Sequence, residues 1–248
     1  MVHYKIRDLI NAFMIEPVMD LLLPAQCVIC TSALSTSEKA VCKTCLDALP
    51  LIEQPQINAL KDEIEPAYFD YLHLVYQFSE EFQKLAHYLK YKRFKVIAGY
   101  FADKLADVLY ANGSIPYDVI TAVPLHPVRL RERGYNQSAL IAANLSTVLN
   151  IPFDDSIIQR IKNTQSQTQL NRAQRVKNVT DAFAVKKTGS NSSILLVDDV
   201  ITTGSTLNAC ALSLKNEGYD VVGVAAMATP VDFLQNSLEE NTSKLERF

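Results

Sequence analysis

Along this chain, segments with the apolar pattern of β-strands alternate with segments whose apolar residues recur at helical spacing. Four segments have the short apolar or β-branched character of strands: 71–78, 119–123, 194–197 and 221–227. Apolar side chains recur at helical spacing in four others: 82–89, 101–109, 141–149 and 207–214. Strands that alternate with helices predict an α/β fold with a parallel sheet flanked by helices.

The residues that follow the run 194–197 are the most specific segment of the sequence. Ligands of parallel sheets bind beyond the carboxyl ends of the strands. Asp198 and Asp199 stand there, and two carboxylates can accept hydrogen bonds from a vicinal diol or hold a hydrated Mg²⁺. The next residues bring hydroxyls and backbone amides to a helix start near Ser205, a phosphate-binding arrangement formed by Thr202, Thr203, Gly204, Ser205 and Thr206. A helix N-cap explains one hydroxyl, but a diol site beside a phosphate site indicates a ribose 5-phosphate.

This segment resembles the signature of type I phosphoribosyltransferases, which bind 5-phosphoribosyl 1-diphosphate with Mg²⁺. The resemblance implies that Asp198 and Asp199 bind the ribose hydroxyls and that residues 202–206 hold the 5-phosphate. It is not a Walker loop, because no lysine follows the glycine. The reaction implied is displacement of diphosphate from C1 of the ribose by a nitrogen nucleophile; no residue is identified as a catalytic base.

Other cationic and polar residues are candidates for the diphosphate or for a lid. After the strand 119–123, alternate arginines would project to one side of an extended segment, although a solvated loop is the alternative. His126 is either a turn residue or a contact of the diphosphate. The basic run 90–95 is either a solvated helix end or one wall of an anion-binding site. The polar stretch 160–178 is long for a loop and indicates a mobile lid or a disordered segment. The candidates are Pro124, Leu125, His126, Arg129, Arg131, Arg133, Lys90, Arg160, Gln167 and Arg175.

Four of the five cysteines form two CxxC pairs, Cys27/Cys30 and Cys42/Cys45, with 11 residues between the pairs. Each pair places two thiolates on one turn, and four sulfurs suit a tetrahedral, structural Zn²⁺ with no open position for a substrate. Two disulfides or a redox function are the alternatives. Cys210 lies on an apolar helical face, which favours a core position.

The order of these motifs resembles the ComF/GntX family over nearly the whole chain. The resemblance rests on the CxxC pairs and on four further groups: Tyr88-Leu89-Lys90-Tyr91, Pro124-Leu125, Arg133-Gly134-Tyr135-Asn136-Gln137, and Arg160 with Asn163-Thr164, Gln167, Leu170, Arg175 and Asn178. That family is linked to DNA uptake in natural competence, and the acceptor of many members is unclear. The resemblance implies a zinc-finger-bearing transferase, with competence or helicase proteins as partners. Single-stranded DNA is a further candidate partner, because the basic run 90–95 together with Tyr88, Tyr91 and Phe94 has the cationic and aromatic side chains that single strands bind.

Composition narrows the class of protein. The chain is 48% hydrophobic and 21% charged, which excludes disorder as its main state, and its net charge of −3 argues against a general nucleic-acid coat. No apolar stretch is long enough to span a membrane, and acidic residues interrupt the N-terminal apolar segment, so we expect no signal peptide and a cytoplasmic location.

Four regions are expected. They are an N-terminal helix with a four-cysteine zinc knuckle (1–48), a linker with little periodicity (49–69), a phosphoribosyltransferase-like domain (70–230) and a C-terminal tail (231–248). Three functions remain open: an active phosphoribosyltransferase, a ligand sensor that retains the phosphate site without turnover, and a factor that handles single-stranded DNA.

Overall fold

A computed structural model describes residues 25–92, 94–113, 116–162, 182–189 and 191–230. The chain divides into two compact units, Met1–Leu49 and Pro50–Phe248, and each is described by itself. The expected N-terminal helix and the tail 231–248 lie outside the described residues. No helix within the described ranges is long and apolar enough to cross a membrane.

The described part of the first unit is a small knuckle of turns followed by a short helix. Gln26 and Ala33 form an antiparallel bridge, and Cys27 donates its amide proton to the Ser32 carbonyl at 2.8 Å. Val28 donates to the Ala40 carbonyl at 3.0 Å, which joins the first CxxC turn to the segment that enters the second. Helix α2 (Lys43–Asp47) then begins directly after Cys42.

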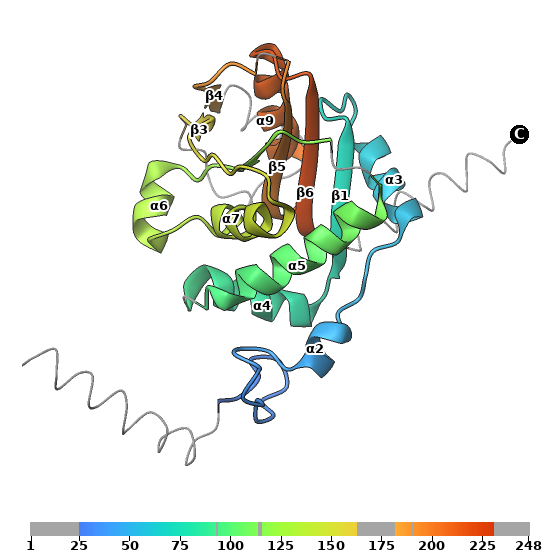
Figure 1. Cartoon of the computed structure of the whole chain (residues 1–248), viewed down its shortest axis with the longest axis vertical. Helices are drawn as coiled ribbons and strands as arrows, with labels where there is room; N and C mark the ends of the chain where they lie inside the picture. Colours follow the sequence, from blue (N-terminus) through green and yellow to red (C-terminus); the bar gives the residue numbers. More distant parts are fainter. Residues whose placement is uncertain (1–24, 93, 114–115, 163–181, 190, 231–248) are drawn as a thin grey trace, which may run out of the picture. The chain divides into compact units, whose positions relative to one another are not determined.

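The second unit is built on a parallel sheet, and the four expected strands are confirmed. Among the described residues the strand order is β1 (Tyr71–Phe78), β6 (Val221–Pro230), β5 (Ser193–Val200) and β2 (Val119–Ala122), with all neighbours parallel. Because the strands run the same way, their carboxyl ends share one edge (Figure 1). The register pairs Ala122 with Val197, so the residues after β2 lie beside Asp198 and Asp199.

Helices cover both faces of the sheet, and the four expected helical segments are confirmed. Helices α5 (Val96–Ala111) and α7 (Gln137–Leu149) pack on each other and contact strands, with α4 (Glu80–Tyr91) beside them (Figure 1). One hydrophobic core joins α3 (Gln54–Glu63) and α9 (Ser205–Asn216) to alternate side chains of three strands, including Leu74, Leu196 and Val224. Burial on both faces explains why these strands are continuously apolar.

Helix α3 corrects the sequence prediction, which described residues 49–69 as a linker. Glu53 and Gln56 form a reciprocal capping box, and a proline stands in the first turn. Ile57 and Leu60 are buried one turn apart. The apolar face of α3 is narrow, so its helical spacing is hidden in the sequence by the surrounding acidic residues and prolines. The face is nevertheless wide enough to pack the helix against the sheet.

A short helix also replaces the extended segment expected after β2. Residues Pro127–Arg133 form α6, which begins with a proline and ends at Gly134 in the left-handed conformation. His126 caps α6, its Nδ1 accepting the Val128 amide proton at 3.3 Å. In addition, β3 (Ile158–Arg160) and β4 (Phe183–Val185) form an antiparallel pair. The two strands flank residues 163–181 in the sequence, which are not among the residues that the structure describes.

Candidate functional site

A cavity of about 360 Å³ lies at the carboxyl edge of the parallel sheet. Strands β1, β2 and β5 each contribute the residues at or after their ends, α4 contributes Lys90, and α6 and α7 contribute their facing turns. The cavity thereby gathers side chains from residues 78 to 207, which are up to 129 positions apart in sequence, as the edge of a parallel sheet does. The lining contains most of the described candidates: Lys90, Pro124, Leu125, Arg129, Arg133, Arg160, Asp198, Asp199, Thr202, Thr203, Gly204, Ser205 and Thr206.

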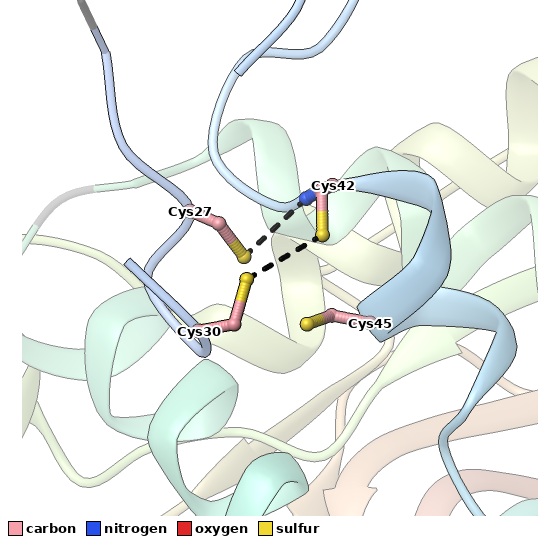
Figure 2. A group of neighbouring side chains, drawn as sticks. All are labelled: Cys27, Cys30, Cys42 and Cys45. Atoms are coloured by element: carbon pink, nitrogen blue, oxygen red, sulfur yellow. Dashed lines mark hydrogen bonds between the residues drawn. The ribbon is translucent and has the colours of Figure 1, made fainter. Parts of the chain in front are cut away.

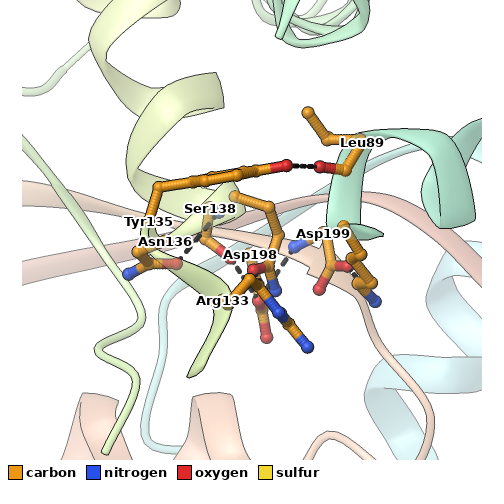
Figure 3. A network of polar contacts seen from close by, with 9 residues as sticks. Leu89, Arg133, Tyr135, Asn136, Ser138, Asp198 and Asp199 are labelled. Atoms are coloured by element: carbon orange, nitrogen blue, oxygen red, sulfur yellow. Dashed lines mark hydrogen bonds and ion pairs between the residues drawn. The ribbon is translucent and has the colours of Figure 1, made fainter. Parts of the chain in front are cut away.

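The acidic pair at the end of β5 has a separate partner for each carboxylate. Oδ1 of Asp198 accepts the Ser138 hydroxyl proton at 2.8 Å and the Asp199 amide proton at 2.8 Å. Asp199 forms an ion pair with Lys90. Figure 3 shows Ser138, Asp198 and Asp199 close together beneath the Tyr135 ring. Burial, reinforced by the charge of Asp199, raises the pKa of Asp198 to about 7.

The hydroxyl-rich loop turns sharply into α9. Ile201 donates its amide proton to the Ala228 carbonyl at 2.9 Å, which fixes the loop to β6. Gly204 precedes the helix at φ 69°, and a β-carbon there would come within 2.2 Å of Ile64. The Thr203 and Ser205 hydroxyls lie 2.8 Å apart. Only glycine combines this backbone conformation with such close packing, and the loop leads hydroxyls and the first amides of α9 to the cavity.

The three arginines of α6 do not project to one side, as they would on the extended segment that the sequence predicted. On a helix, residues four apart share a face, so Arg129 and Arg133 line the cavity whereas Arg131 is outside the described lining. Arg133 also stacks over the Tyr91 ring at 5.3 Å. His126 is likewise outside that lining, in agreement with the alternative of a turn residue.

Arg160 reaches the cavity from β3 and lies over the Phe183 ring at 5.6 Å. Burial lowers its pKa, and the nearby Arg129 charge acts in the same direction. Two further candidates, Gln167 and Arg175, lie outside the described residues, as does most of the stretch expected to form a lid.

Sequence reasoning missed Ser138, which directly contacts the acidic pair. Asn136 caps α7 by accepting the Ser138 amide proton at 3.1 Å, and its own amide donates to the Val123 carbonyl at 2.9 Å. Tyr135 donates its hydroxyl proton to the Leu89 carbonyl (Figure 3). A serine one residue into a helix looks like ordinary capping chemistry, so no sequence signal separates it from a structural residue.

A second and larger cavity of about 680 Å³ lies against the same loop. Thr203 and Ser205 belong to the linings of both cavities, so the loop is a wall between them. The larger cavity is otherwise formed by the end of α3 and the residues that follow it, by Ile161 and β4, and by one face of α9.

The four CxxC cysteines of the first unit converge (Figure 2). Their sulfur atoms all lie within 4.8 Å of one another, and those of Cys30 and Cys42 are 3.7 Å apart. Tetrahedral Zn²⁺ with bonds of about 2.3 Å requires sulfurs about 3.8 Å apart, so the cluster fits such an ion. The Ser32 hydroxyl and amide lower the pKa of Cys30 to about 6, whereas burial and the neighbouring sulfurs raise the pKa of Cys45. Cys210 is fully buried in the second unit, as expected.

Comparison with known proteins agrees with this architecture. A family profile described as the phosphoribosyl transferase domain matches residues 136–244. DNA utilization protein YhgH of Salmonella typhimurium is 30% identical over 220 residues, which are 82% of this chain and 96% of that protein. Competence protein F of Haemophilus influenzae is 39% identical over 114 residues, 45% of this chain and 50% of that protein.

A solved adenine phosphoribosyltransferase from Thermoanaerobacter pseudethanolicus is 15% identical, with a TM-score of 0.39 over 63% of this chain and 79% of that one. The profile match and the parallel sheet flanked by helices identify the second unit as a phosphoribosyltransferase-like α/β domain. The match along nearly all of YhgH, together with the four-cysteine cluster, shows more: the chain belongs to the ComF/GntX family.

Proposed function

We propose that this chain binds 5-phosphoribosyl 1-diphosphate with Mg²⁺ and acts as a phosphoribosyltransferase in a process that takes up or uses DNA. The observation that carries the proposal is the single cavity that combines an acidic pair, a hydroxyl-rich helix start and several cationic side chains. The names of the relatives, competence protein F and DNA utilization protein YhgH, support the cellular role.

The donor's parts match the parts of the cavity. The carboxylates of Asp198 and Asp199 would accept hydrogen bonds from the ribose hydroxyls, and residues 202–206 would hold the 5-phosphate with amide and hydroxyl donors. Arg129 and Arg133 would bind the diphosphate. The carboxylate pair is a donor set that Mg²⁺ accepts, and the ion would neutralise charge on the departing diphosphate.

The transfer breaks the bond between C1 and the diphosphate oxygen while a nitrogen–C1 bond forms. The diphosphate leaves with the bonding electron pair, and the proton that the nitrogen nucleophile loses passes to solvent or to an oxygen of the departing diphosphate. Charge that resembles an oxocarbenium ion develops on the ribose, and carboxylates beside the ring would stabilise it. The lining cations would stabilise the diphosphate as its charge grows.

The test is calorimetric titration of the protein with 5-phosphoribosyl 1-diphosphate and Mg²⁺, followed by diphosphate release across candidate nitrogen acceptors. Asp198→Asn with Asp199→Asn should weaken donor binding at least about tenfold, because each charge-assisted hydrogen bond is worth about 1.5–3 kcal/mol. Asp103→Asn with Asp107→Asn, on exposed positions of α5, is the control with the same charge change. Unchanged donor affinity in the site variant would refute the assignment, and binding without diphosphate release would leave a ligand sensor.

A second function, binding of single-stranded DNA, is favoured by the surface at the end of α4. Tyr91 and Phe94 are 61% and 37% exposed, and Lys92 and Lys95 are exposed beside them. Aromatic rings for base stacking together with cations for the phosphates are what single strands bind. Gel-shift titration over a range of salt concentrations tests this function, because real phosphate contacts weaken steeply with salt.

The cysteine cluster is proposed to hold one structural Zn²⁺. The support is the fit of its sulfur–sulfur distances to a tetrahedral ion. With four protein sulfurs as ligands no position remains for a substrate, so the ion would stabilise the knuckle and take no part in transfer.

A further inference from the structure

Lys90 is fixed at the cavity by anchors on both sides of it in the sequence. Tyr135, between α6 and α7, donates its hydroxyl proton to the Leu89 carbonyl (Figure 3). Arg133, at the end of α6, stacks over the Tyr91 ring. The last turn of α4 is therefore held against the α6–α7 junction, and the Lys90 side chain reaches the acidic pair from a defined position.

The ammonium group of Lys90 pairs with Asp199 and not with Asp198 in this structure. The two side chains of the pair are only 24% and 10% exposed, so solvent screens the pair weakly. Asp198 takes its hydrogen bonds from Ser138 and from the Asp199 amide. Asp199, which accepts no hydrogen bond from Ser138, is thus the carboxylate that forms the ion pair with Lys90.

Asp199 belongs to the pair that the proposed function assigns to the ribose and Mg²⁺, so its present partner must give way when the donor binds. A half-buried lysine released from its carboxylate is stabilised by another anion. The same cavity would contain the donor's phosphates, and Arg129, Arg133 and Arg160 line it as well. The cationic lining shows that the space beside Lys90 suits an anion.

We propose that Lys90 is a positioning residue that acts as an exchangeable counter-ion. Its ammonium group occupies Asp199 in the free chain and transfers to the donor's phosphates on binding, and this frees the carboxylate for the ribose and the divalent cation. The proposal rests on the proposed function. In the free chain a divalent cation would therefore compete with Lys90 for Asp199. Once the donor has drawn Lys90 away, bound donor would increase the affinity of the chain for the cation, and bound cation would increase its affinity for the donor.

Mn²⁺ binding to the donor-free protein tests the exchange without any need for turnover. Mn²⁺ prefers the same oxygen ligands as Mg²⁺, and its free form is counted by electron paramagnetic resonance. Lys90→Met should bind Mn²⁺ at least about fivefold more tightly than the unchanged chain, the lower end of the range for coupled sites. Lys90→Arg should behave as the unchanged chain because it keeps the charge. Lys92→Met, at the exposed end of the same helix, is the matched control.

A second measurement repeats the Mn²⁺ titration with saturating 5-phosphoribosyl 1-diphosphate. The donor should increase Mn²⁺ affinity in the unchanged chain, and this increase should shrink at least about fivefold in Lys90→Met. Lys90→Gln replaces Lys90→Met if circular dichroism shows that the latter does not fold.

Equal Mn²⁺ affinities of the Lys90→Met, Lys92→Met and unchanged proteins would overturn the exchange. Absence of Mn²⁺ binding in all of them would overturn it as well, since no cation site would then compete with Lys90. Failure of the unchanged chain to bind the donor refutes the proposed function instead, and the donor-free titration still decides whether Lys90 blocks a cation site.

Discussion

The Ser138 hydroxyl donates a hydrogen bond of 2.8 Å to Oδ1 of Asp198 and so joins the first turn of α7 to the end of β5. This contact lowers the pKa of Asp198, but burial and the charge of Asp199 outweigh it and raise that pKa to about 7. The acidic pair of the free chain therefore contains a carboxyl that takes up a proton near neutral pH.

The first prediction concerns the stability of the donor-free protein. The folded pKa of Asp198 lies above its unfolded value of about 3.9, so the native state binds more protons between these two values and stability falls as pH rises through about 7. Asp198→Asn removes this loss. At pH 8 the melting temperature by circular dichroism should be higher in the variant than in the unchanged chain, and this difference should shrink as pH falls and vanish only near pH 4.

Ser138→Ala extends the same prediction. Loss of the donated hydrogen bond should raise the pKa of Asp198 further and move the fall in stability to higher pH. A melting-temperature difference between Asp198→Asn and the unchanged chain that stays constant from pH 5 to pH 8 would show that Asp198 does not titrate in this range.

The second prediction concerns Gly204. Gly204→Ala should cost about 1–3 kcal/mol from backbone strain alone. A clash with Ile64 at 2.2 Å adds to this and displaces the loop, so donor affinity should fall at least about tenfold, as 1.4 kcal/mol of lost binding would give. Denaturant unfolding and calorimetry measure the two effects.

Gly113→Ala is the control for the strain at Gly204. Its φ is 103°, but a β-carbon there meets nothing within 4 Å, so that variant should lose stability through strain and retain donor affinity. A second change, Ile64→Ala, should restore part of the donor affinity of Gly204→Ala. Equal donor affinities in all three variants would mean that the loop does not touch the ligand.

The third prediction concerns the metal. The protein as purified should contain about one Zn²⁺ per chain, released by thiol-reactive reagents and measured by atomic emission. Cys27→Ser should abolish zinc retention and unfold the first unit, while the circular dichroism of the α/β unit persists, because the chain forms two separate compact units. Cys210→Ser is the control, since that thiol lies in the core of the second unit. Stoichiometric disulfides without metal in a native preparation would contradict the assignment.

The fourth prediction separates the basic run from the donor site. Changing Lys92, Arg93 and Lys95 together to Ala should weaken single-strand binding and flatten its salt dependence by up to about three ions' worth, at a slope near 0.7 per ion. Donor affinity should stay within a factor of about three, because Lys92 and Lys95 are exposed to solvent, which screens their charges, and neither belongs to the described cavity lining.

Matched changes of Lys84, Lys104 and Lys186, which are exposed elsewhere on the second unit, alter the net charge equally and should leave single-strand binding intact. If the basic-run variant abolishes donor binding and spares DNA binding, the run belongs to the donor site. If neither ligand is affected, the run is a solvated helix end.

The sequence predicted the sheet well, because parallel strands that are buried on both faces are continuously apolar. It also predicted that a helix begins near Ser205, because a hydroxyl-rich segment with a glycine directly after a buried strand is typical of a helix start. It failed where a short helix competes with an extended chain. The alternation of Arg129, Arg131 and Arg133 suited a strand, but Pro127 and the His126 cap begin a helix that turns Arg131 away. Ser138 was beyond prediction for another reason, since its role depends on a strand 60 residues later.

The loop that separates the two cavities is thin enough for the same two residues, Thr203 and Ser205, to line both. A small molecule in the larger cavity would contact the hydroxyl-rich loop from the side opposite to the acidic pair. Inhibitors of this protein therefore need not be highly charged mimics of the donor. A compound that contacts the loop from the larger cavity would be a non-competitive inhibitor, because excess donor would not relieve its inhibition.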